Sequence, residues 1–318
     1  MKTKQDVSTL HIACAIDDAF SYPMAVMLIS LFENNIQNKI KIHLFSAALS
    51  REFIELFDNL TLSYKQQFKF YELTHEHFKN FPTNDRISFA SYYRLVIPEI
   101  IEIDTEKFLY LDADIVIAGD LKPLFELNLE SKMFGAVNDI SAIEQKMYIK
   151  HKIPEEYLYF NAGVLLIYKK RWNQKKATMK VLNYIENNKN LCLFHDQDGL
   201  NASLFSERQN ILPVWNQQIG IFFTDKKLLE YVYPKGLNLA ISKPIIIHFN
   251  GGEKPWHQVS AHPFKKDFKK YAKKLKGIHY QEPWNLKKQI KRFLLYGILG
   301  WINVNRYYNQ QALKKNHI

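Results

Sequence analysis

Cysteine, glycine and long apolar runs are scarce in this 318-residue chain, and each scarcity excludes a class of protein. The two cysteines, Cys14 and Cys192, make neither a disulfide framework nor a zinc cluster, and so favour a reducing compartment. The sequence contains no glycine-rich phosphate loop, so it does not indicate a dinucleotide-binding or Walker-type site. The apolar run at residues 293–302 falls well short of the roughly 20 residues that span a bilayer. Residues 1–10 lack the apolar core of a signal peptide, so we do not expect secretion.

Positive charge is concentrated at one end of the chain. The net charge is +11. Residues 262–318 alone carry +12, with 14 lysines and arginines against two acids. The remaining body is near −1 and lacks the basic surface of a nucleic-acid-binding protein. Its composition, 47% hydrophobic and 14% aromatic, is that of a globular protein. We predict one domain at residues 1–261 and a basic, aromatic, amphipathic tail at residues 262–318.

Apolar runs of strand length alternate with helix-length segments along the body. This order predicts an α/β fold in which helices flank a mostly parallel sheet. The expected strands are residues 9–16, 41–47, 68–73, 108–117, 134–138, 159–167 and 244–249. The expected helices are residues 21–34, 50–64, 88–101, 120–127, 172–187, a segment from residue 200 onward, and 264–275. We expect the polar stretch after Asp139 to form a flexible lid.

One of these strands is interrupted by two carboxylates, Asp112 and Asp114. Positions i and i+2 of a strand share a face, and the two side chains still converge if the strand ends there. Ligands of open α/β sheets bind at this carboxyl end. Two unpaired carboxylates in apolar surroundings are unfavourable, and a magnesium or manganese ion offsets that cost. The alternative is that both are turn or cap residues, and the pair alone does not decide.

Further polar residues lie at strand ends or inside apolar segments, and each has a structural alternative. Asp17 follows the first strand and suits either a base or ribose contact or a helix cap. Arg94 is either a surface side chain or a phosphate or carboxylate partner. Asn161 lies within a predicted strand, where its amide must bond a neighbouring backbone or a ligand hydroxyl. His248 is either a core residue or a ligand, and the Gly-Gly-Glu-Lys turn behind it raises the ligand alternative.

The tail contains two basic amphipathic patches. In the first, the apolar residues at helical spacing are Phe264, Phe268, Tyr271, Ala272 and Leu275. In the second, four basic residues within 287–292 precede the apolar run at 293–302. Such a segment suits an interfacial helix on an anionic membrane, and the alternative is a helix packed on the core. We therefore expect a cytoplasmic protein that is peripheral on the inner face of the cell membrane.

Six segments, taken in order, resemble the family 8 glycosyltransferases, and most of all the bacterial lipopolysaccharide α-galactosyl- and α-glucosyltransferases. They are residues 12–20 (IACAIDDAF), 87–95 (ISFASYYRL), 110–121 (YLDADIVIAGDL), 159–167 (YFNAGVLLI), 195–201 (HDQDGLN) and 248–256 (HFNGGEKPW). Each segment alone is weak, but all six in the family's order, over residues 10–257, make a strong signal. The resemblance implies a GT-A fold, a UDP-sugar donor, and a manganese or magnesium ion.

The resemblance also implies roles for individual residues. The family's metal ligands match Asp112, Asp114 and His248. Its nucleotide contacts match Asp17 at the uracil, Asp112 at the ribose and Lys254 at the diphosphate. Its donor-sugar contacts match Arg94, Asp139, Asn161, Asp196 and Gln197. The implied donor is UDP-galactose or UDP-glucose, and the implied acceptor is a saccharide or lipid-linked saccharide such as lipopolysaccharide core.

Two positions depart from the family pattern. Ala19 stands where an asparagine that contacts the nucleotide is frequent, and Phe20 stands where tyrosine is common. The nucleotide pocket therefore loses one polar contact. The resemblance implies the identity of the nucleotide less directly than it implies the metal site.

The resemblance implies retention of the anomeric configuration and leaves two mechanisms open. One is front-face attack through an oxocarbenium-like state, and the other passes through a covalent glycosyl-enzyme. Gln197 matches the residue near the reacting face, and as a neutral amide it is a poor nucleophile, which favours front-face attack. Asp196 or Asp139 would serve as the nucleophile only if aimed at the anomeric carbon. These three are the candidate catalytic residues.

Two other classes compete with a glycosyltransferase. A phosphatase of the haloacid-dehalogenase type also carries an Asp-x-Asp strand end, but that strand normally opens its domain, whereas three strand–helix units precede it here. It also has no role for His248. The other alternative is a non-catalytic binder of sugar nucleotides or glycans at the membrane, and an intact metal site argues against it.

Overall fold

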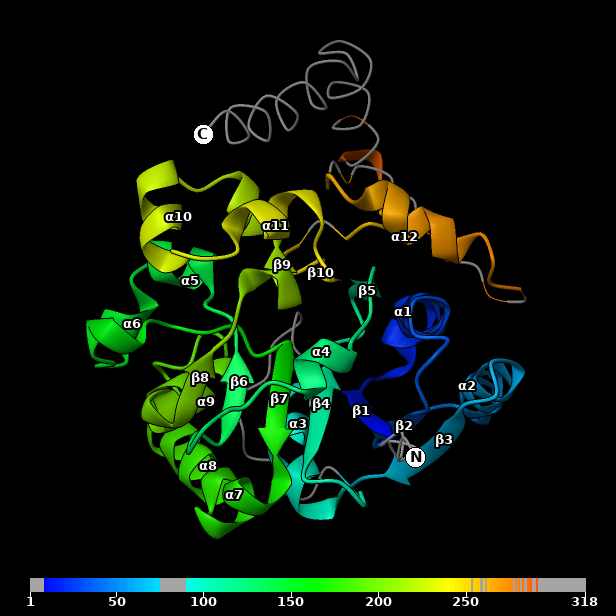
Figure 1. The fold of residues 1–318 in the computed structure, drawn as a ribbon, viewed down its shortest axis with the longest axis horizontal. Coiled ribbons are helices and arrows are strands. Elements are labelled where there is room, and N and C mark those ends of the chain that lie inside the picture. Colours follow the sequence, from blue (N-terminus) through cyan, green and yellow to red (C-terminus); the bar gives the residue numbers. More distant parts are fainter. Residues whose placement is uncertain are drawn as a thin grey trace, which may run out of the picture.

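The computed structural model describes residues 9–74, 90–252, 254–257, 260 and 262–276, with residues 278, 280, 282, 285–287 and 290. Its large sheet has the strand order β3-β2-β1-β4-β7-β6-β8 (Figure 1). The strands are β1 (Leu10–Ala15), β2 (Ile40–Ser46), β3 (Gln67–Glu72), β4 (Lys107–Leu111), β6 (Phe134–Ala136), β7 (Val164–Tyr168) and β8 (Arg208–Asn210). All neighbours are parallel except that β7 runs antiparallel to β4 and β6. The predicted mostly parallel α/β sheet is confirmed.

Helices cover both faces of this sheet, as expected for parallel strands buried on two sides. One face packs against α1 (Ser21–Glu33) and α2 (Arg51–Ser63). The other packs against α3 (Ala90–Ile100), α7 (Lys169–Gln174), α8 (Ala177–Asn187) and α9 (Asp196–Leu204). Alternate residues of β4 serve the two cores: Leu109 and Leu111 point to the α1 side, and Phe108 and Tyr110 to the α3 side.

A second, three-stranded sheet lies beyond the carboxyl end of β4. It consists of β5 (Ile115–Ile117), β10 (Ile246–His248) and β9 (Gln217–Gln218), with β10 in the middle. The apolar run at residues 108–117 is therefore divided between two sheets, and Asp112-Ala113-Asp114 links them. The other helices are α4 (Lys122–Phe125), α5 (Ile140–Glu144), α6 (Met147–Lys150), α10 (Lys226–Val232), α11 (Leu237–Ser242) and α12 (Lys265–Ala272).

Asn161 does not lie in a strand, contrary to the sequence prediction. Its Oδ1 accepts a hydrogen bond from the backbone N–H of Gly163 at 3.0 Å, which is the bond of an Asx turn. The turn occupies Ala162 and Gly163, so β7 begins only at Val164. A short polar side chain that bonds backbone two residues ahead favours a turn over a ladder.

Two further predictions near the site are corrected. The expected lid after Asp139 forms two short helices, α5 and α6, and the Asp139 carboxylate caps α5 by accepting from the N–H of Ala142 at 3.0 Å. The helix expected from residue 200 begins at Asp196, so that Asp196 and Asp198 lie in its first turn. Carboxylates are favoured there by the helix dipole.

The first basic patch of the tail packs on the body. On α12, Phe268 and Tyr271 are 1% and 3% exposed in the α1-side core, and Asn34 donates to the Tyr271 hydroxyl at 2.8 Å. This is the alternative that the sequence left open. The second apolar run, residues 293–302, lies outside the described residues. Within the described part of the chain no helix is long and apolar enough to cross a membrane. The division at residues 261 and 262 stays a prediction.

Candidate active site

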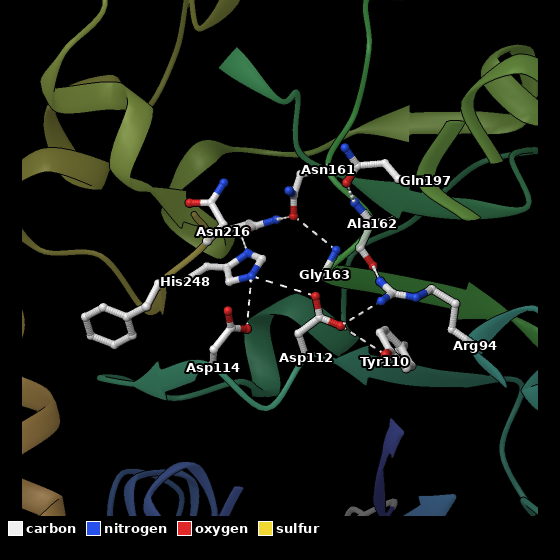
Figure 2. Close-up of polar contacts among 12 residues, drawn as sticks. Arg94, Tyr110, Asp112, Asp114, Asn161, Ala162, Gly163, Gln197, Asn216 and His248 are labelled. Carbon is white, nitrogen blue, oxygen red and sulfur yellow. Dashed lines mark hydrogen bonds and ion pairs between the residues drawn. The ribbon is translucent and has the colours of Figure 1, made fainter. Parts of the chain in front are cut away.

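The three predicted metal ligands converge where the two sheets meet (Figure 2). Asp112, Asp114 and His248 each place one ligand atom within 4.8 Å of the others. Nε2 of His248 is 3.3 Å from Oδ1 of Asp114 and 3.8 Å from Oδ2 of Asp112. Two carboxylates and one imidazole nitrogen, gathered at this spacing, form a donor set that fits a divalent cation.

Strand register explains why a residue 134 positions after Asp114 joins it. His248 pairs with Ile115 in the antiparallel ladder between β10 and β5. The next residue, Phe249, donates its backbone N–H to the carbonyl of Asp114 at 2.9 Å. The second sheet therefore holds His248 beside the link between β4 and β5, and this depends on long-range pairing.

Gly163 allows the side chains of Asp112 and His248 to approach each other. Its carbonyl accepts the N–H of Asp112 at 2.9 Å, so the backbones of the two residues lie side by side. A Cβ at position 163 would lie 2.3 Å from Cε1 of His248 and 2.7 Å from Oδ2 of Asp112. Both distances are below any real contact, so only glycine fits between the two ligands.

Lys254 brings a positive charge to the cluster. Its Nζ lies 2.6 Å from Oδ2 of Asp114 and donates to the carbonyl of Phe249 at 2.9 Å. Burial alone would raise the pKa of Asp114, but Lys254 and His248 outweigh it and hold that pKa below its ordinary value. Asp114 is therefore ionised at neutral pH. The structure places Lys254 against a predicted metal ligand, and its predicted diphosphate contact stays a prediction.

Arg94 faces the site and contacts two carboxylates, so it is not the surface side chain of the first alternative. Its guanidinium is 3.1 Å from Oδ1 of Asp112, 2.8 Å from Oδ2 of Asp196, and donates to the carbonyl of Ala162 at 2.7 Å. Oδ1 of Asp112 also accepts from the hydroxyl of Tyr110 at 2.9 Å. Burial, together with Asp112 and against Arg94, raises the pKa of Asp196 to about 7.

A cavity of about 370 Å³ opens beside the metal ligands, within the usual size range of ligand pockets. All five predicted donor-sugar residues line it: Arg94, Asp139, Asn161, Asp196 and Gln197. Asp112 lines it as well, so the cavity and the metal cluster share one residue. The remaining lining residues are Ser141, Ala142, Gln145, Phe194, Ile219, Asn250 and Gly251.

Hydrogen bonds within this cavity fix the orientation of Gln197. Its Oε1 accepts from the N–H of Ala162 at 2.9 Å, and its Nε2 donates to Oδ2 of Asp139 at 3.1 Å. The same carboxylate oxygen accepts from Nδ2 of Asn161 at 3.0 Å. With its bond to α5, Asp139 therefore accepts three hydrogen bonds from the described residues.

Asp17 lies two residues beyond β1, which is the parallel neighbour of β4, so both strands end at the same edge of the sheet. It does not line the cavity. Its Oδ1 is buried without a hydrogen-bond partner among the described residues. A buried carboxylate oxygen in that condition is suited to a donor from a ligand.

Sequence reasoning missed three residues of the site. Gly163 and Tyr110 lie inside segments that carry the resemblance, yet nothing in the sequence marks their contacts. Asn216 lies outside all six segments, is fully buried, and touches both His248 and Asn161. In the sequence, Asn216 is a lone asparagine between Trp215 and two glutamines, and this pattern is too weak to predict a site residue.

Comparison with known proteins places this site in a family. The family model for glycosyl transferase family 8 matches residues 11–260. General stress protein A of Bacillus subtilis (strain 168) is 27% identical over 266 residues, covering 82% of this chain and 92% of the relative. Lipopolysaccharide 1,2-glucosyltransferase of Escherichia coli is 28% identical over 298 residues, covering 89% of this chain and 83% of the relative.

Among solved structures, the galactosyltransferase LgtC in complex with donor and acceptor sugar analogues has a TM-score of 0.77 and 25% identity. The match covers 89% of this chain and all of that one. It confirms the predicted GT-A type fold. The family match confirms the predicted hexosyltransferase over the phosphatase and the non-catalytic binder. The chain belongs to glycosyl transferase family 8.

Proposed function

We propose that this protein transfers a hexose, glucose or galactose, from a UDP-sugar to a saccharide acceptor, with a divalent cation and with retention of the anomeric configuration. One observation carries the proposal: the cluster of Asp112, Asp114 and His248 adjoins a cavity lined by every residue expected to contact the donor sugar. Asp112 belongs to both. A sugar in the cavity would therefore have its phosphate end at the cluster.

Asp112, Asp114 and His248 would hold the cation, manganese or magnesium. The donor set supports this, because two carboxylates and an imidazole gather within 4.8 Å in buried or half-buried positions. Bound there, the ion supplies Lewis-acid stabilisation of the diphosphate leaving group. Lys254, which lies at the same cluster, would add a preorganised positive charge for the diphosphate.

The nucleotide would occupy the sheet edge beside β1 and β4. The unpartnered Oδ1 of Asp17 suits the N–H of a uracil base, and Asp112 suits a ribose hydroxyl. Ala19 and Phe20 stand where the family often has asparagine and tyrosine, so Asp17 would carry more of the base recognition here.

The sugar would lie in the cavity, with Arg94, Asn161, Asp139, Asp196 and Gln197 as hydrogen-bonding partners for its hydroxyls. The carboxylates of Asp139 and Asp196 are poorly placed to act as nucleophiles, because their oxygens are already engaged. Asp139 accepts three hydrogen bonds, and Asp196 is paired with Arg94. Gln197 is a neutral amide with a fixed orientation. These contacts support front-face attack, in which the acceptor hydroxyl gives its proton to the leaving phosphate oxygen.

The proposed acceptor is lipopolysaccharide core or another lipid-linked glycan. The lipopolysaccharide glucosyltransferase among the relatives supports that class. We further propose a cytoplasmic protein that is peripheral on the inner face of the membrane. The +12 charge of residues 262–318 supports this location, because clustered lysine and arginine attract anionic lipid.

The experiment is a hydrolysis screen of UDP-glucose, UDP-galactose, UDP-N-acetylglucosamine and other nucleotide sugars in the presence of Mn²⁺. We expect slow release of UDP from one hexose donor, abolished by a chelator and restored by added Mn²⁺. Nuclear magnetic resonance of the released sugar would report the anomer first formed. Release of phosphate from sugar phosphates, with no turnover of any nucleotide sugar, would contradict the proposal.

A further inference from the structure

We propose that Asn216 is a positioning residue that holds a hydrogen on Nδ1 of His248, so that Nε2, beside the carboxylates, is the nitrogen left to bind a cation. This inference rests on the proposed metal site. Asn216 is completely buried, immediately before β9. The parallel pairing of Ile247 with Gln217 brings it beside His248 (Figure 2).

Asn216 bridges two residues of the site. Its Oδ1 lies 3.0 Å from Nδ1 of His248, and its Nδ2 donates to Oδ1 of Asn161 at 2.9 Å. An amide and an imidazole can each be turned around in principle, so these contacts alone leave the direction of the bonds open. The hydrogen bonds on the other side of Asn161 determine that direction.

The backbone N–H of Gly163 sets the direction. It can only donate, and it lies 3.0 Å from the side-chain atom of Asn161 that faces it, so that atom is the oxygen. The other side of the same amide donates to the carboxylate of Asp139, which is consistent. Since the oxygen of Asn161 faces Asn216, the atom of Asn216 that meets it must be the amino group.

The consequence reaches the metal site. The remaining atom of Asn216 is its oxygen, an acceptor, so Nδ1 of His248 must carry a hydrogen. Nε2, which lies 3.3 and 3.8 Å from the carboxylate oxygens, is then the nitrogen that offers its lone pair when a cation binds. A metal ligand requires that lone pair, and a partner on the other ring nitrogen tunes metal affinity. A single backbone N–H thus prepares His248 through two buried amides.

The test measures Mn²⁺ affinity directly, by electron paramagnetic resonance of free Mn²⁺. Asn216→Ala removes the acceptor, and we expect binding to weaken by about 10–100-fold, the range for losing such a partner of a metal-binding histidine. Asn216→Asp keeps an oxygen facing Nδ1 and, protonated on its other oxygen, still donates to Asn161, so we expect it to retain most of the affinity. Asn38→Ala is the matched control, because Asn38 is also a buried amide but bonds Asn35 and Asp120 instead.

A second measurement reports the ring itself. In metal-free protein labelled with ¹⁵N-histidine, we expect Nδ1 of His248 to carry a hydrogen that is bonded to Asn216. In Asn216→Ala we expect a mixture or the opposite tautomer. His248→Gln assigns the signal, and thermal melts without metal confirm that each variant is folded. A merely structural role for Asn216 would leave the tautomer unchanged.

Two failures are distinguishable. If Asn216→Ala binds Mn²⁺ as tightly as the wild type while Asp114→Asn has lost binding, the role of Asn216 is wrong and the metal site stands. If the wild type binds neither Mn²⁺ nor Mg²⁺, the metal site of the proposed function is wrong, and this inference falls with it.

Discussion

Two buried histidine networks lie in different parts of the molecule and use their ring nitrogens differently. On the α3 side of the large sheet, His11 and His43 share a hydrogen bond of 2.9 Å. The outer nitrogen of His11 meets Asp104 at 2.6 Å, and the outer nitrogen of His43 meets the hydroxyl of Tyr71 at 3.0 Å. At the junction of the two sheets, His248 has one nitrogen on an asparagine and the other facing two carboxylates.

The difference separates a structural network from a binding site. In the first network every ring nitrogen has a partner within the chain, and a single direction of bonds from Tyr71 to Asp104 satisfies all of them. In the second, Asn216 bonds Nδ1 of His248, and Nε2 faces the carboxylates of Asp112 and Asp114. A buried histidine is therefore informative only once the partners of both its nitrogens are known.

The largest effect should come from the same substitution made in both regions. We expect Asp114→Asn to lower sugar transfer by at least about 10³-fold, since a catalytic metal contributes several kcal/mol and each 1.4 kcal/mol is tenfold. Asp104→Asn, in the His11 network, should leave turnover unchanged because Asp104 is not among the residues that line the cavity. Initial rates of UDP release measure both. Equal losses in the two variants would break the comparison.

A methyl group at Gly163 should disturb the site next most strongly. In Gly163→Ala the new Cβ would overlap His248 and Asp112, so we expect loss of Mn²⁺ binding and a destabilisation of about 1–3 kcal/mol. Gly119→Ala is the control, since the three atoms nearest its Cβ all belong to the side chain of Ile245, at 3.3 Å or more, and none to the site. Calorimetric titration and thermal melts report the two quantities. Undiminished metal binding in Gly163→Ala would show that the ligands are not packed as described.

The histidine network predicts a loss of stability in acid. Burial, aided by neighbouring His11, lowers the pKa of His43 to about 3, so below pH 6.5 the unfolded chain binds a proton that the folded chain does not. The free energy of unfolding should therefore fall as pH drops from about 6.5 toward 3, by up to about 1.4 kcal/mol per unit from this group. His43→Gln should show a shallower slope in urea titrations. An identical slope would exclude His43 as the cause.

The active site predicts a smaller effect of opposite sign. Because burial raises the pKa of Asp196 to about 7, the folded chain keeps a proton that the unfolded chain has lost above about pH 4. This contribution to the free energy of unfolding is present below about pH 4 and is lost as pH rises through 7, partly compensated by Arg94. The free energy of unfolding of Asp196→Asn, minus that of the wild type, should thus be larger at pH 8 than at pH 5. A difference independent of pH would contradict the raised pKa.

Local patterns predicted most of the fold. The strands β1 to β4 and the helices between them follow from apolar runs, whereas the sequence alone does not decide whether the run at residues 108–117 breaks at Asp112 and Asp114. Asn161 was placed wrongly because its side chain bonds the backbone of Gly163, a competition that a pattern of apolar residues does not reveal.

The site itself depended on long-range pairing. His248 entered through resemblance to a family, and only the ladder between β10 and β5 explains why it joins Asp114. Asn216 is 32 residues from His248 and 55 from Asn161 in sequence, and no local signal connects them. Strand register determines which residues bond a ligand residue such as His248, so a positioning residue such as Asn216 is found only in the structure.

The proposed function requires that Asp112, Asp114 and His248 hold the cation that serves a nucleotide-sugar donor. Anomalous scattering at the manganese edge, from crystals grown with Mn²⁺ and UDP, would locate that cation. We predict one peak, bonded to an oxygen of each aspartate and to Nε2 of His248, with the diphosphate on its open side. A crystal that binds UDP with no peak at these residues, or with the peak elsewhere, would contradict the proposed function.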